Sequence, residues 1–302
     1  MSSITVSAFA KINLTLRVLG ARADDFHDVR TVLHTIDLSD RIVCTVRRGP
    51  LRLRCRTRGV PVDSTNLVWR AAEALWRASG RTAEPRDLSL TLTKRIPARA
   101  GLGGGSSDAA ATLTALSRLW RIDLPPAELA QVAAGLGSDV PFFLCGGAAL
   151  GVGRGDEVYP LPDLPPWWAL IAVPPFGVST ADAYGWRDGD ADDGAGREAE
   201  PTLDPRVTRT WLGRLSARQN DLQAPVARRH PWIADTVARL QGAGALLAGM
   251  SGSGSAVYGL FASRAGALAA RRRLPTRHAR ALHVTRLLSR PAFARAARPR
   301  AN

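Results

Sequence analysis

The sequence predicts a mixed α/β (α+β) protein that is long enough for two domains. Its 302 residues exceed the roughly 100–200 residues of a single domain. Near the N-terminus, Ile4, Val6, Leu14, Leu16 and Val18 share one face of a period-two pattern, as in a half-buried strand. Farther along, a strand pattern, a glycine-rich loop and a helix pattern succeed one another between residues 88 and 120. Such interleaving of strands and helices is typical of α/β folds.

The first half of the chain is expected to begin with strands up to about residue 58. A helix is predicted next, over Ser64 to Ser79, and it is expected to end there because Gly80 is a stop signal. The alternation at residues 88–92 predicts a half-buried strand that leads into the glycine-rich loop. After the loop and its helix, a short helix is predicted over Pro126 to Leu136, and residues 142–158 are predicted to form a glycine-rich hairpin.

The second half is predicted to open with a buried strand over Trp168 to Val173. Residues 187–205 are rich in Asp, Gly, Glu and Pro, which predicts a mobile surface loop. A glycine-serine turn from Gly249 to Gly254 then leads into a strand over Ser255 to Phe261. No internal repeat is evident.

The most informative segment is the glycine loop, which runs from Gly101 to Asp108. Glycines let a backbone approach a ligand closely, and the free N–H groups and positive end of the following helix favour bound phosphate. Ser106, Ser107 and Asp108 are expected at capping positions, and a tight turn with an ordinary N-cap is the alternative. The loop lacks the Gly-Lys-Ser/Thr of a P-loop, and Ser106 replaces the last glycine of the dinucleotide fingerprint.

Lysine usage is a second signal. Of the 41 basic residues only Lys11 and Lys94 are lysine, and the others are arginine. A chain with this bias should keep lysine where a compact ammonium is needed and a guanidinium would not fit. Chance survival is the alternative.

Charge and apolar patterning limit the choice of partners. The net charge is +15, but the arginines are spread along the chain and are most frequent in the last forty residues. This distribution is typical of solvated helix faces and a basic tail. We therefore expect steering of polyanionic substrates and no dedicated nucleic-acid function. No run of about 18 apolar residues occurs. We therefore expect a cytoplasmic location and no membrane partner. Cys44, Cys55 and Cys145 match no zinc spacing, which fits reduced thiols. A monomer and a homodimer both remain open.

Three segments resemble the signature motifs of the GHMP kinases, which phosphorylate small molecules. They are Lys11 to Asn13, Pro97 to Ala110, and Gly249 to Ser255. The resemblance implies an ATP-binding N-terminal domain of the ribosomal-protein-S5 type over residues 1–160. It also implies a ferredoxin-like, substrate-binding C-terminal domain over residues 161–302, an active site between the two domains, and the use of ATP and Mg²⁺.

Four further segments most resemble one branch of this family. They are Ala10 to Leu14, Arg22 to His27, Leu136 to Pro141, and Asn220-Asp221. The branch phosphorylates the hydroxyl at position 2 of a cytidine-diphosphate-linked methylerythritol in the non-mevalonate route to isoprenoids. A GHMP kinase for mevalonate, homoserine or a sugar is the alternative, and a non-catalytic basic binding protein is a further one.

The resemblance also assigns roles in phosphoryl transfer. Asp139 is expected to accept the hydroxyl proton and Lys11 to stabilise charge on the transferring group; a helix-terminal turn is the alternative for Asp139. Asn66 and Lys94 resemble residues that line the adenine site. Ser107 is a candidate Mg²⁺ ligand, and an ordinary cap explains it as well. The expected phosphate-binding residues are Pro97, Gly101, Leu102, Gly103, Gly104, Gly105, Ser106 and Ser107, and those of the third motif are Gly252, Ser253 and Gly254.

The substrate side is expected to recognise a pyrimidine. Phe26 and His27 resemble the aromatic-histidine pair of this branch, and Tyr184 resembles the aromatic that opposes it. Ring stacking combined with contacts from a histidine edge would favour a pyrimidine base. Asn13 and Thr180 resemble polar contacts to the substrate.

The chain departs from the family pattern at two places. Asp25 occupies a position that is usually glycine, and Arg99 with Ala100 replaces small residues before the glycine loop. If the turn needs positive φ at Asp25, Asp tolerates it better than most residues, but some strain is expected. Arg99 either adds a phosphate contact or points into solvent.

Overall fold

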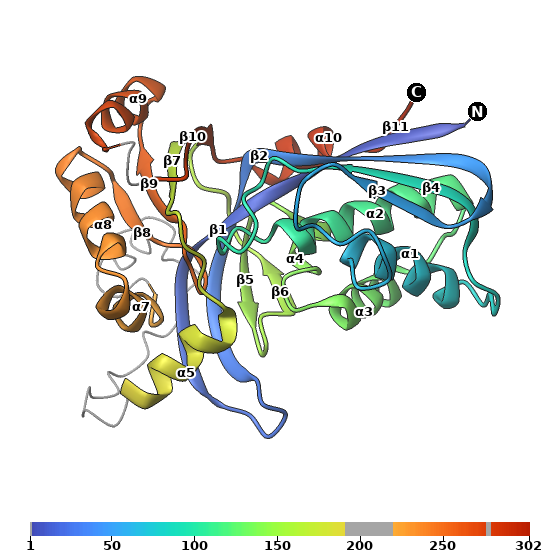
Figure 1. Ribbon diagram of the computed structural model, residues 1–302, viewed down its shortest axis with the longest axis horizontal. Coiled ribbons are helices and arrows are strands. Elements are labelled where there is room, and N and C mark those ends of the chain that lie inside the picture. The colour runs from blue at the N-terminus through green and yellow to red at the C-terminus, as the bar shows by residue number, and fades with distance from the viewer. Residues whose placement is uncertain (1, 191–219, 276–278) are drawn as a thin grey trace.

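The computed structural model describes residues 2–190, 220–275 and 279–302. Two β-sheets with helices packed against them form two lobes (Figure 1). The predicted domain boundary at residue 160 falls between the last hairpin of the first sheet and the first strand of the second. Within the described ranges no helix has both the length and the apolar character needed to cross a membrane.

The first sheet has seven strands and is built around a long antiparallel pair. That pair is β1 (Ser3–Ala21) and β2 (His27–Pro50), whose far end reaches the bottom of the view in Figure 1. The order is β11-β1-β2-β4-β3, and β5 pairs with β2 and with β6. The remaining strands are β3 (Arg52–Cys55), β4 (Arg86–Thr93), β5 (Ala148–Val152), β6 (Glu157–Pro160) and β11 (Arg300–Ala301).

Helices cover one face of the first sheet. They are α1 (Leu67–Ala78), α2 (Gly104–Trp120), α3 (Pro126–Leu136) and the short α4 (Phe142–Cys145). The period-two residues Ile4 and Val6 of β1 and Leu90 of β4 are buried in the same core as Leu113 of α2. Burial of this apolar face is the main stabilising contribution expected here.

The second sheet has the order β10-β7-β9-β8. Its strands are β7 (Trp168–Val173), β8 (Leu247–Met250), β9 (Val257–Phe261) and β10 (Ala281–Arg286). The helices that follow β7 along the chain are α5 (Thr180–Asp190), α7 (Gln223–Arg229), α8 (Trp232–Gly242), α9 (Arg264–Arg273) and α10 (Arg290–Ala296). Of these, α10 packs on the first sheet, because its Phe293 contacts Phe9 of β1. Ile12 and Leu14 of β1 share a buried core with Ile171 of β7 and Leu260 of β9, so the two sheets pack against each other. The glycine loop and the turn after β8 are therefore held close together.

Several predicted elements are confirmed. The helix over Pro126–Leu136 and the strand over Trp168–Val173 have the predicted limits. The predicted first helix begins three residues late, at Leu67, because Asn66 Oδ1 caps it by accepting a bond from the Val68 N–H.

Three predictions are wrong in part. The helix after the glycine loop begins at Gly104 with Gly103 as its N-cap and without a side-chain cap, so Ser106, Ser107 and Asp108 lie inside the helix instead of capping it. The hairpin predicted from Phe142 begins only at Ala148, because residues 142–145 form the short helix α4. In the predicted loop of residues 187–205, the first four residues belong to α5, and the others lie outside the described residues.

Candidate active site

Lys11 lies where the three glycine- and lysine-containing motifs meet. Its side chain is almost fully buried in β1, and Nζ donates to Asn13 Oδ1 at 2.5 Å. Nζ also lies 3.3 Å from Asp139 Oδ2, and the Lys11 backbone N–H donates to Leu102 O at 3.1 Å. Because Leu102 belongs to the glycine loop, one lysine contacts two motifs and the carboxylate of a third segment.

Glycine is required on two sides of the Lys11 side chain. A Cβ at Gly103 would lie 2.7 Å from the Phe143 ring and 3.1 Å from Lys11 Cε. A Cβ at Gly252 would lie 3.4 Å from Lys11 Nζ. Both residues have positive φ, 69° and 57° respectively, which side chains rarely adopt. The two loops thus enclose the ammonium with bare backbone.

The glycine loop and the turn after β8 are joined directly. A Cβ at Gly101 would lie only 2.0 Å from Ser251 O. Ser251 Oγ donates to Gly101 O at 2.8 Å and accepts from the Asn13 N–H at 3.2 Å. Asn220 Nδ2 donates to Gly252 O at 2.8 Å and to Met250 O at 2.9 Å, which fixes the turn. Substitution at Gly101 would separate the two loops.

Asp139 sits in the turn between α3 and α4. Its side chain is 34% exposed, whereas that of Lys11 is 4% exposed. The carboxylate therefore faces open space with a buried cation behind it. A carboxylate that can reach a bound hydroxyl, next to a fixed positive charge, is an arrangement suited to proton acceptance and stabilisation of negative charge.

The start of α2 has the properties of an anion site. Gly103 is the N-cap residue of α2, has a left-handed backbone, and makes no side-chain hydrogen bond. The first backbone hydrogen bond of the helix runs from the Ser107 N–H to Gly103 O at 2.9 Å. The N–H groups of Gly104, Gly105 and Ser106 precede this bond and have no intrahelical acceptor. N–H groups at a helix start, together with the helix dipole, favour phosphate. The missing cap thus leaves these donors for a ligand.

Ser107 is less suited to metal binding than its position suggests. Its hydroxyl is buried and donates to Phe9 O at 2.6 Å. In the described part of the chain, no group of three or more His, Cys, Asp and Glu side chains is placed to hold a metal ion. Mg²⁺ is commonly held by one or two carboxylates together with nucleotide phosphates and water. Asp139, the exposed carboxylate beside Lys11, is the side chain here that fits such a shared site.

Lys94 is held inside the protein by two carboxylates. Its Nζ donates to Asp108 Oδ2 at 2.6 Å and to Asp40, whose other oxygen accepts from the N–H groups of Arg95 and Ile96 at 2.5 and 2.9 Å. Burial alone would lower the pKa of Lys94, but the Asp108 and Asp40 carboxylates outweigh it and raise that pKa. Burial likewise raises the pKa of Asp108 well above its usual range, against the effect of Lys94.

These contacts change the interpretation of the two residues expected near adenine. The Lys94 ammonium is packed under the glycine loop, where a Cβ at Gly104 would lie 3.2 Å from Nζ. The Asn66 side chain caps α1 and donates to Pro61 O at 2.6 Å. Both side chains are thus occupied by protein groups. Asp40 and Asp108 were missed as partners from sequence; the rarity of lysine was the one signal that pointed to this cluster.

The expected pyrimidine-binding residues lie where the β1–β2 hairpin meets α5. The rings of His27 and Tyr184 lie 4.6 Å apart at an interplanar angle of 30°. Phe26 is 48% exposed, and the Arg154 guanidinium lies 5.0 Å from its ring. Burial, with the Asp139 charge as the next cause, raises the pKa of Tyr184 to about 12. The structure thus brings Tyr184 against His27 and near Asp139, with Phe26 exposed beside them.

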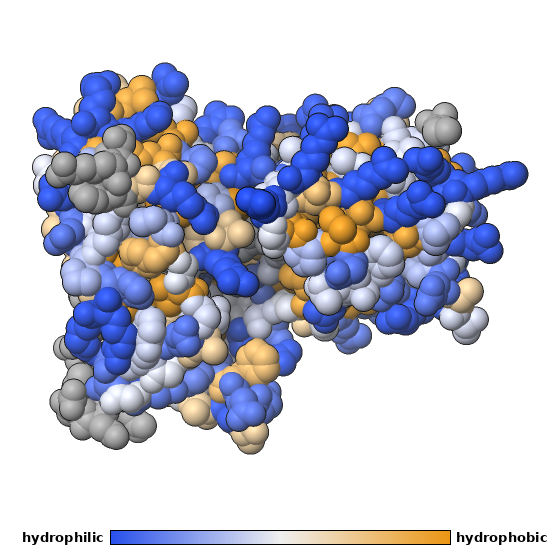
Figure 2. Space-filling model, viewed as in Figure 1, coloured by the Kyte–Doolittle hydropathy of each residue, from blue (hydrophilic) through white to orange (hydrophobic). Residues whose placement is uncertain are grey.

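The other expected substrate contacts lie at the loop junction. Asn13 Nδ2 donates to Thr31 Oγ1 at 2.7 Å, while its Oδ1 accepts from Lys11. Thr180 Oγ1 lies 3.1 Å from Ser253 Oγ, which connects the start of α5 to the third motif. Figure 2 shows a hollow near the middle of the face it presents, between the two lobes.

Both departures from the family pattern have left-handed backbone. Asp25 has a φ of 61° and Arg99 a φ of 54°. The strain expected at Asp25 is confirmed, and the same applies to Arg99. The Arg99 side chain is exposed and has no hydrogen-bond or ion-pair partner among the described residues.

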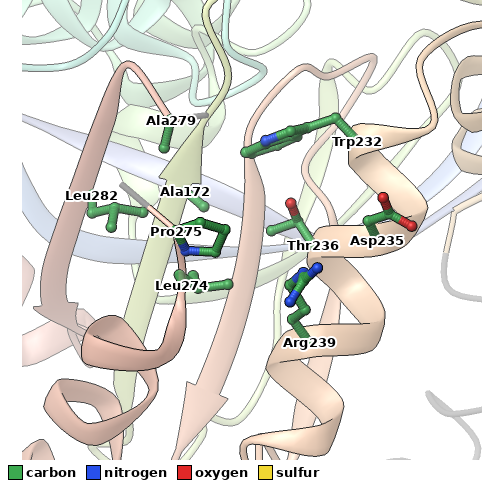
Figure 3. Close-up of a pocket in the computed structure, with 9 residues that line it drawn as sticks. All are labelled: Ala172, Trp232, Asp235, Thr236, Arg239, Leu274, Pro275, Ala279 and Leu282. Carbon is green, nitrogen blue, oxygen red and sulfur yellow. The ribbon is translucent and has the colours of Figure 1, made fainter. Parts of the chain in front are cut away.

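A separate cavity of about 300 Å³ lies in the second lobe (Figure 3). Trp232 and Thr236 of α8 face Leu274 and Leu282 across it. Of the described residues that line this cavity, none belongs to the three motifs. The site around Lys11 is thus distinct from it.

Comparison with known proteins agrees with this geometry. A model of the GHMP kinases N terminal domain matches residues 66–147, and a model of the GHMP kinases C terminal domain matches residues 208–280. A 4-diphosphocytidyl-2-C-methyl-D-erythritol kinase from Solibacter usitatus is 45% identical over 273 residues, which is 85% of this chain and 81% of that protein. One from Moorella thermoacetica is 41% identical over 267 residues, covering 87% and 91%.

Solved structures give the same result. A crystal structure of 4-(cytidine 5'-diphospho)-2C-methyl-D-erythritol kinase superposes with a TM-score of 0.75 at 33% identity, covering 94% of this chain and 98% of that one. A homoserine kinase from Cytophaga hutchinsonii has a TM-score of 0.69 at 18% identity, covering 99% and 97%. At that identity the second likeness concerns the fold alone.

Proposed function

The chain belongs to the GHMP kinases and, within them, to the 4-diphosphocytidyl-2-C-methyl-D-erythritol kinase family, and from this premise we propose that it transfers the γ-phosphoryl group of ATP to the hydroxyl at position 2 of 4-diphosphocytidyl-2-C-methyl-D-erythritol. This reaction belongs to the non-mevalonate route to isoprenoid precursors. The observation that carries the proposal is the pairing of buried Lys11 with exposed Asp139 at 3.3 Å, beside a helix start with free N–H groups.

The roles of the residues follow from their surroundings. The N–H groups of Gly104, Gly105 and Ser106 bind the phosphates of ATP. Asp139 orients the acceptor hydroxyl and takes its proton as the phosphoryl group transfers. Lys11 keeps Asp139 in place and stabilises charge on the transferring group. Because the transition state of phosphoryl transfer is loose, an ordinary carboxylate is a sufficient proton acceptor.

Mg²⁺ enters this proposal as part of the nucleotide complex. Bound to the ATP phosphates, it would neutralise charge during the transfer. Asp139 is the exposed carboxylate at the site that would share it, while the Ser107 hydroxyl is already bonded to Phe9 O. We therefore assign Ser107 mainly to fixing α2 against β1.

The partners are proposed to be ATP and the cytidine diphosphate substrate. Tyr184, His27 and Phe26 surround the proposed base site. The reaction is proposed to take place in the cytoplasm, since Cys44, Cys55 and Cys145 are all free thiols. The three cysteines give no sign of an oxidising compartment.

The test is ADP formation with a panel of acceptors. Purified protein with ATP and Mg²⁺ is given 4-diphosphocytidyl-2-C-methyl-D-erythritol, mevalonate, homoserine or galactose. We expect only the first to stimulate ADP release and ³¹P NMR to place the new phosphate at position 2. Stimulation by another acceptor would replace the proposed substrate, and no stimulation by any of them would contradict a kinase.

A further inference from the structure

Building on the proposed function, we propose that Asp188 is a positioning residue that determines which pyrimidine the site accepts. It does so by holding the hydrogen of His27 on Nε2. The other ring nitrogen is then an acceptor, which suits the amino group at C4 of cytosine and not the carbonyl at C4 of uracil. Asp188 itself does not contact the base.

The first step rests on one short contact. His27 Nε2 lies 2.8 Å from Asp188 Oδ2. An ionised carboxylate can only accept hydrogen bonds, so Nε2 must carry the hydrogen and donate it. In the neutral ring Nδ1 is then without a hydrogen. His27 Nδ1 has no hydrogen-bond partner in the described ranges, so this acceptor is available to a ligand.

The second step is that Asp188 is itself held in place. Its Oδ1 accepts from Arg187 Nη1 at 3.1 Å, and Arg187 Nη2 donates to Val18 O at 3.2 Å. Val18 lies in β1, the partner strand of the one that begins with His27. The α5 carboxylate is thereby tied to the hairpin that carries the histidine, so the orientation of the imidazole is set before a ligand arrives.

The third step is the immobilisation of the ring. Tyr184 lies against the His27 ring at 4.6 Å, and the His27 side chain is only 14% exposed. Asp188 and Tyr184 are one helical turn apart on α5, so they lie on one face of the helix. From that face Asp188 contacts the edge of the imidazole and Tyr184 packs against its plane. A ring fixed in this way cannot turn to offer a donor to uracil.

Discrimination follows from the chemistry of the two bases. Cytosine offers a donor at C4, and uracil offers an acceptor there. A site that accepts a hydrogen bond from its ligand rejects an analogue that leaves the acceptor unpaired. A difference of roughly ten- to a hundredfold is expected, as for one hydrogen bond to a partly buried group.

The first measurement identifies the tautomer without any catalysis. Long-range ¹H–¹⁵N NMR of His27 in the free protein should show hydrogen on Nε2 and none on Nδ1 of the neutral ring. In Asp188→Ala the Nε2–H form should lose its dominance, while in Asp182→Asn, an exposed carboxylate on the same helix, it should be unchanged. Hydrogen on Nδ1 of the neutral ring in the unaltered protein would overturn the proposal.

The second measurement is base selectivity. With the nucleotide site filled by ADP, the affinities for CDP and UDP are measured by calorimetry for the unaltered protein, Asp188→Asn and Asp182→Asn. The amide introduced by Asp188→Asn can donate to Nε2 and so permit hydrogen on Nδ1. We expect the CDP preference to fall at least tenfold in Asp188→Asn alone. An unchanged preference would overturn the proposal.

Failure of this inference is separable from failure of the proposed function. Absence of ADP formation with every acceptor contradicts the kinase and leaves the tautomer and the CDP preference measurable. A working kinase whose CDP preference survives Asp188→Asn keeps its function and loses the role of Asp188.

Discussion

Lys11 and Asp139 form an ion pair in which the cation is buried and the carboxylate is not, with side-chain exposures of 4% and 34%. The pair differs from a surface salt bridge, whose contribution to stability is typically below about 1 kcal/mol. Lys11 also donates to Asn13 and is enclosed by the backbone at Gly103 and Gly252. The cation thus has one position, and it presents the Asp139 carboxylate to whatever occupies the open side.

Replacing Asp139 by Asn should separate positioning from proton acceptance. The amide keeps the size and polarity of the side chain but cannot take a proton. We expect kcat to fall by roughly 10² to 10⁴ while the KM for ATP stays within about twofold. Steady-state kinetics check both values. Turnover close to that of the unaltered enzyme would contradict the assignment of Asp139 as the base.

Removing the Tyr184 ring should weaken the cytidine substrate and spare ATP. Tyr184 packs on His27, so Tyr184→Ala removes an aromatic platform and frees the imidazole. Phe26→Ala removes the exposed ring beside His27 in the β1–β2 hairpin. Each should raise the KM for the cytidine substrate by about tenfold, as for a stacking contact worth on the order of 1 kcal/mol. A rise in the KM for ATP instead would show that the two nucleotide sites had been exchanged.

Replacing Lys94 should destabilise the protein. Lys94→Met leaves Asp40 and Asp108 buried without their cation, which should lower the free energy of unfolding by roughly 3–5 kcal/mol. Urea denaturation measures this loss. Burial raises the pKa of Asp108 in the folded state, and the variant loses the opposing effect of Lys94, so stability is lost as the pH rises through that pKa. The deficit should therefore shrink toward acidic pH.

A double variant provides the control for Lys94. Adding Asp108→Asn to Lys94→Met removes one of the two unpaired carboxylates and should recover part of the lost stability at neutral pH. The buried Asp108 Oδ1 has no hydrogen-bond partner among the described residues, so no hydrogen bond at that oxygen is lost in Asp108→Asn. A loss below about 1 kcal/mol in Lys94→Met would contradict a structural role for the cluster.

Arg99→Gly should stabilise the protein. Arg99 has a φ of 54°, and the left-handed region costs a residue other than glycine roughly 1 kcal/mol. We expect the free energy of unfolding to rise by about 0.5–1 kcal/mol in denaturant titrations. The KM for ATP distinguishes the two expectations for its side chain. No change indicates a side chain directed into solvent, whereas a rise indicates a phosphate contact.

Local patterns predicted the elements better than their contacts. The strand Trp168–Val173 and the helix Pro126–Leu136 follow from apolar runs and from proline and glycine, which act over a few residues. The role of Asp108 was assigned wrongly, because a polar residue near a helix start resembles a cap until its partner Lys94 is located. That partner directly follows β4, and no local pattern encodes the contact.

The candidate site shows the same limit. The motif residues around Lys11 could be predicted because each carries its own signature in the sequence. Asp40 and Asp188 could not be predicted. Each is a single carboxylate in an ordinary strand or helix and gains its meaning only from the side chain it contacts, Lys94 and His27 respectively.

Because the chain otherwise uses arginine for nearly all its basic residues, Lys11→Arg is the sharpest test of the role proposed for Lys11. Arginine keeps the charge but brings a longer, planar head into a space bounded by bare backbone at Gly103 and Gly252. The guanidinium should displace Asp139 by about 1 Å, and a misplacement of this size at the reacting atoms costs around a hundredfold.

We therefore expect kcat to fall at least a hundredfold in Lys11→Arg. Arg17→Lys, the reverse exchange at a partly exposed position of the same strand, is the matched control and should leave kcat unchanged. Circular dichroism should give both variants the folded spectrum of the unaltered protein. Full activity in Lys11→Arg would mean that charge alone suffices and that the lysine survived in this sequence by chance.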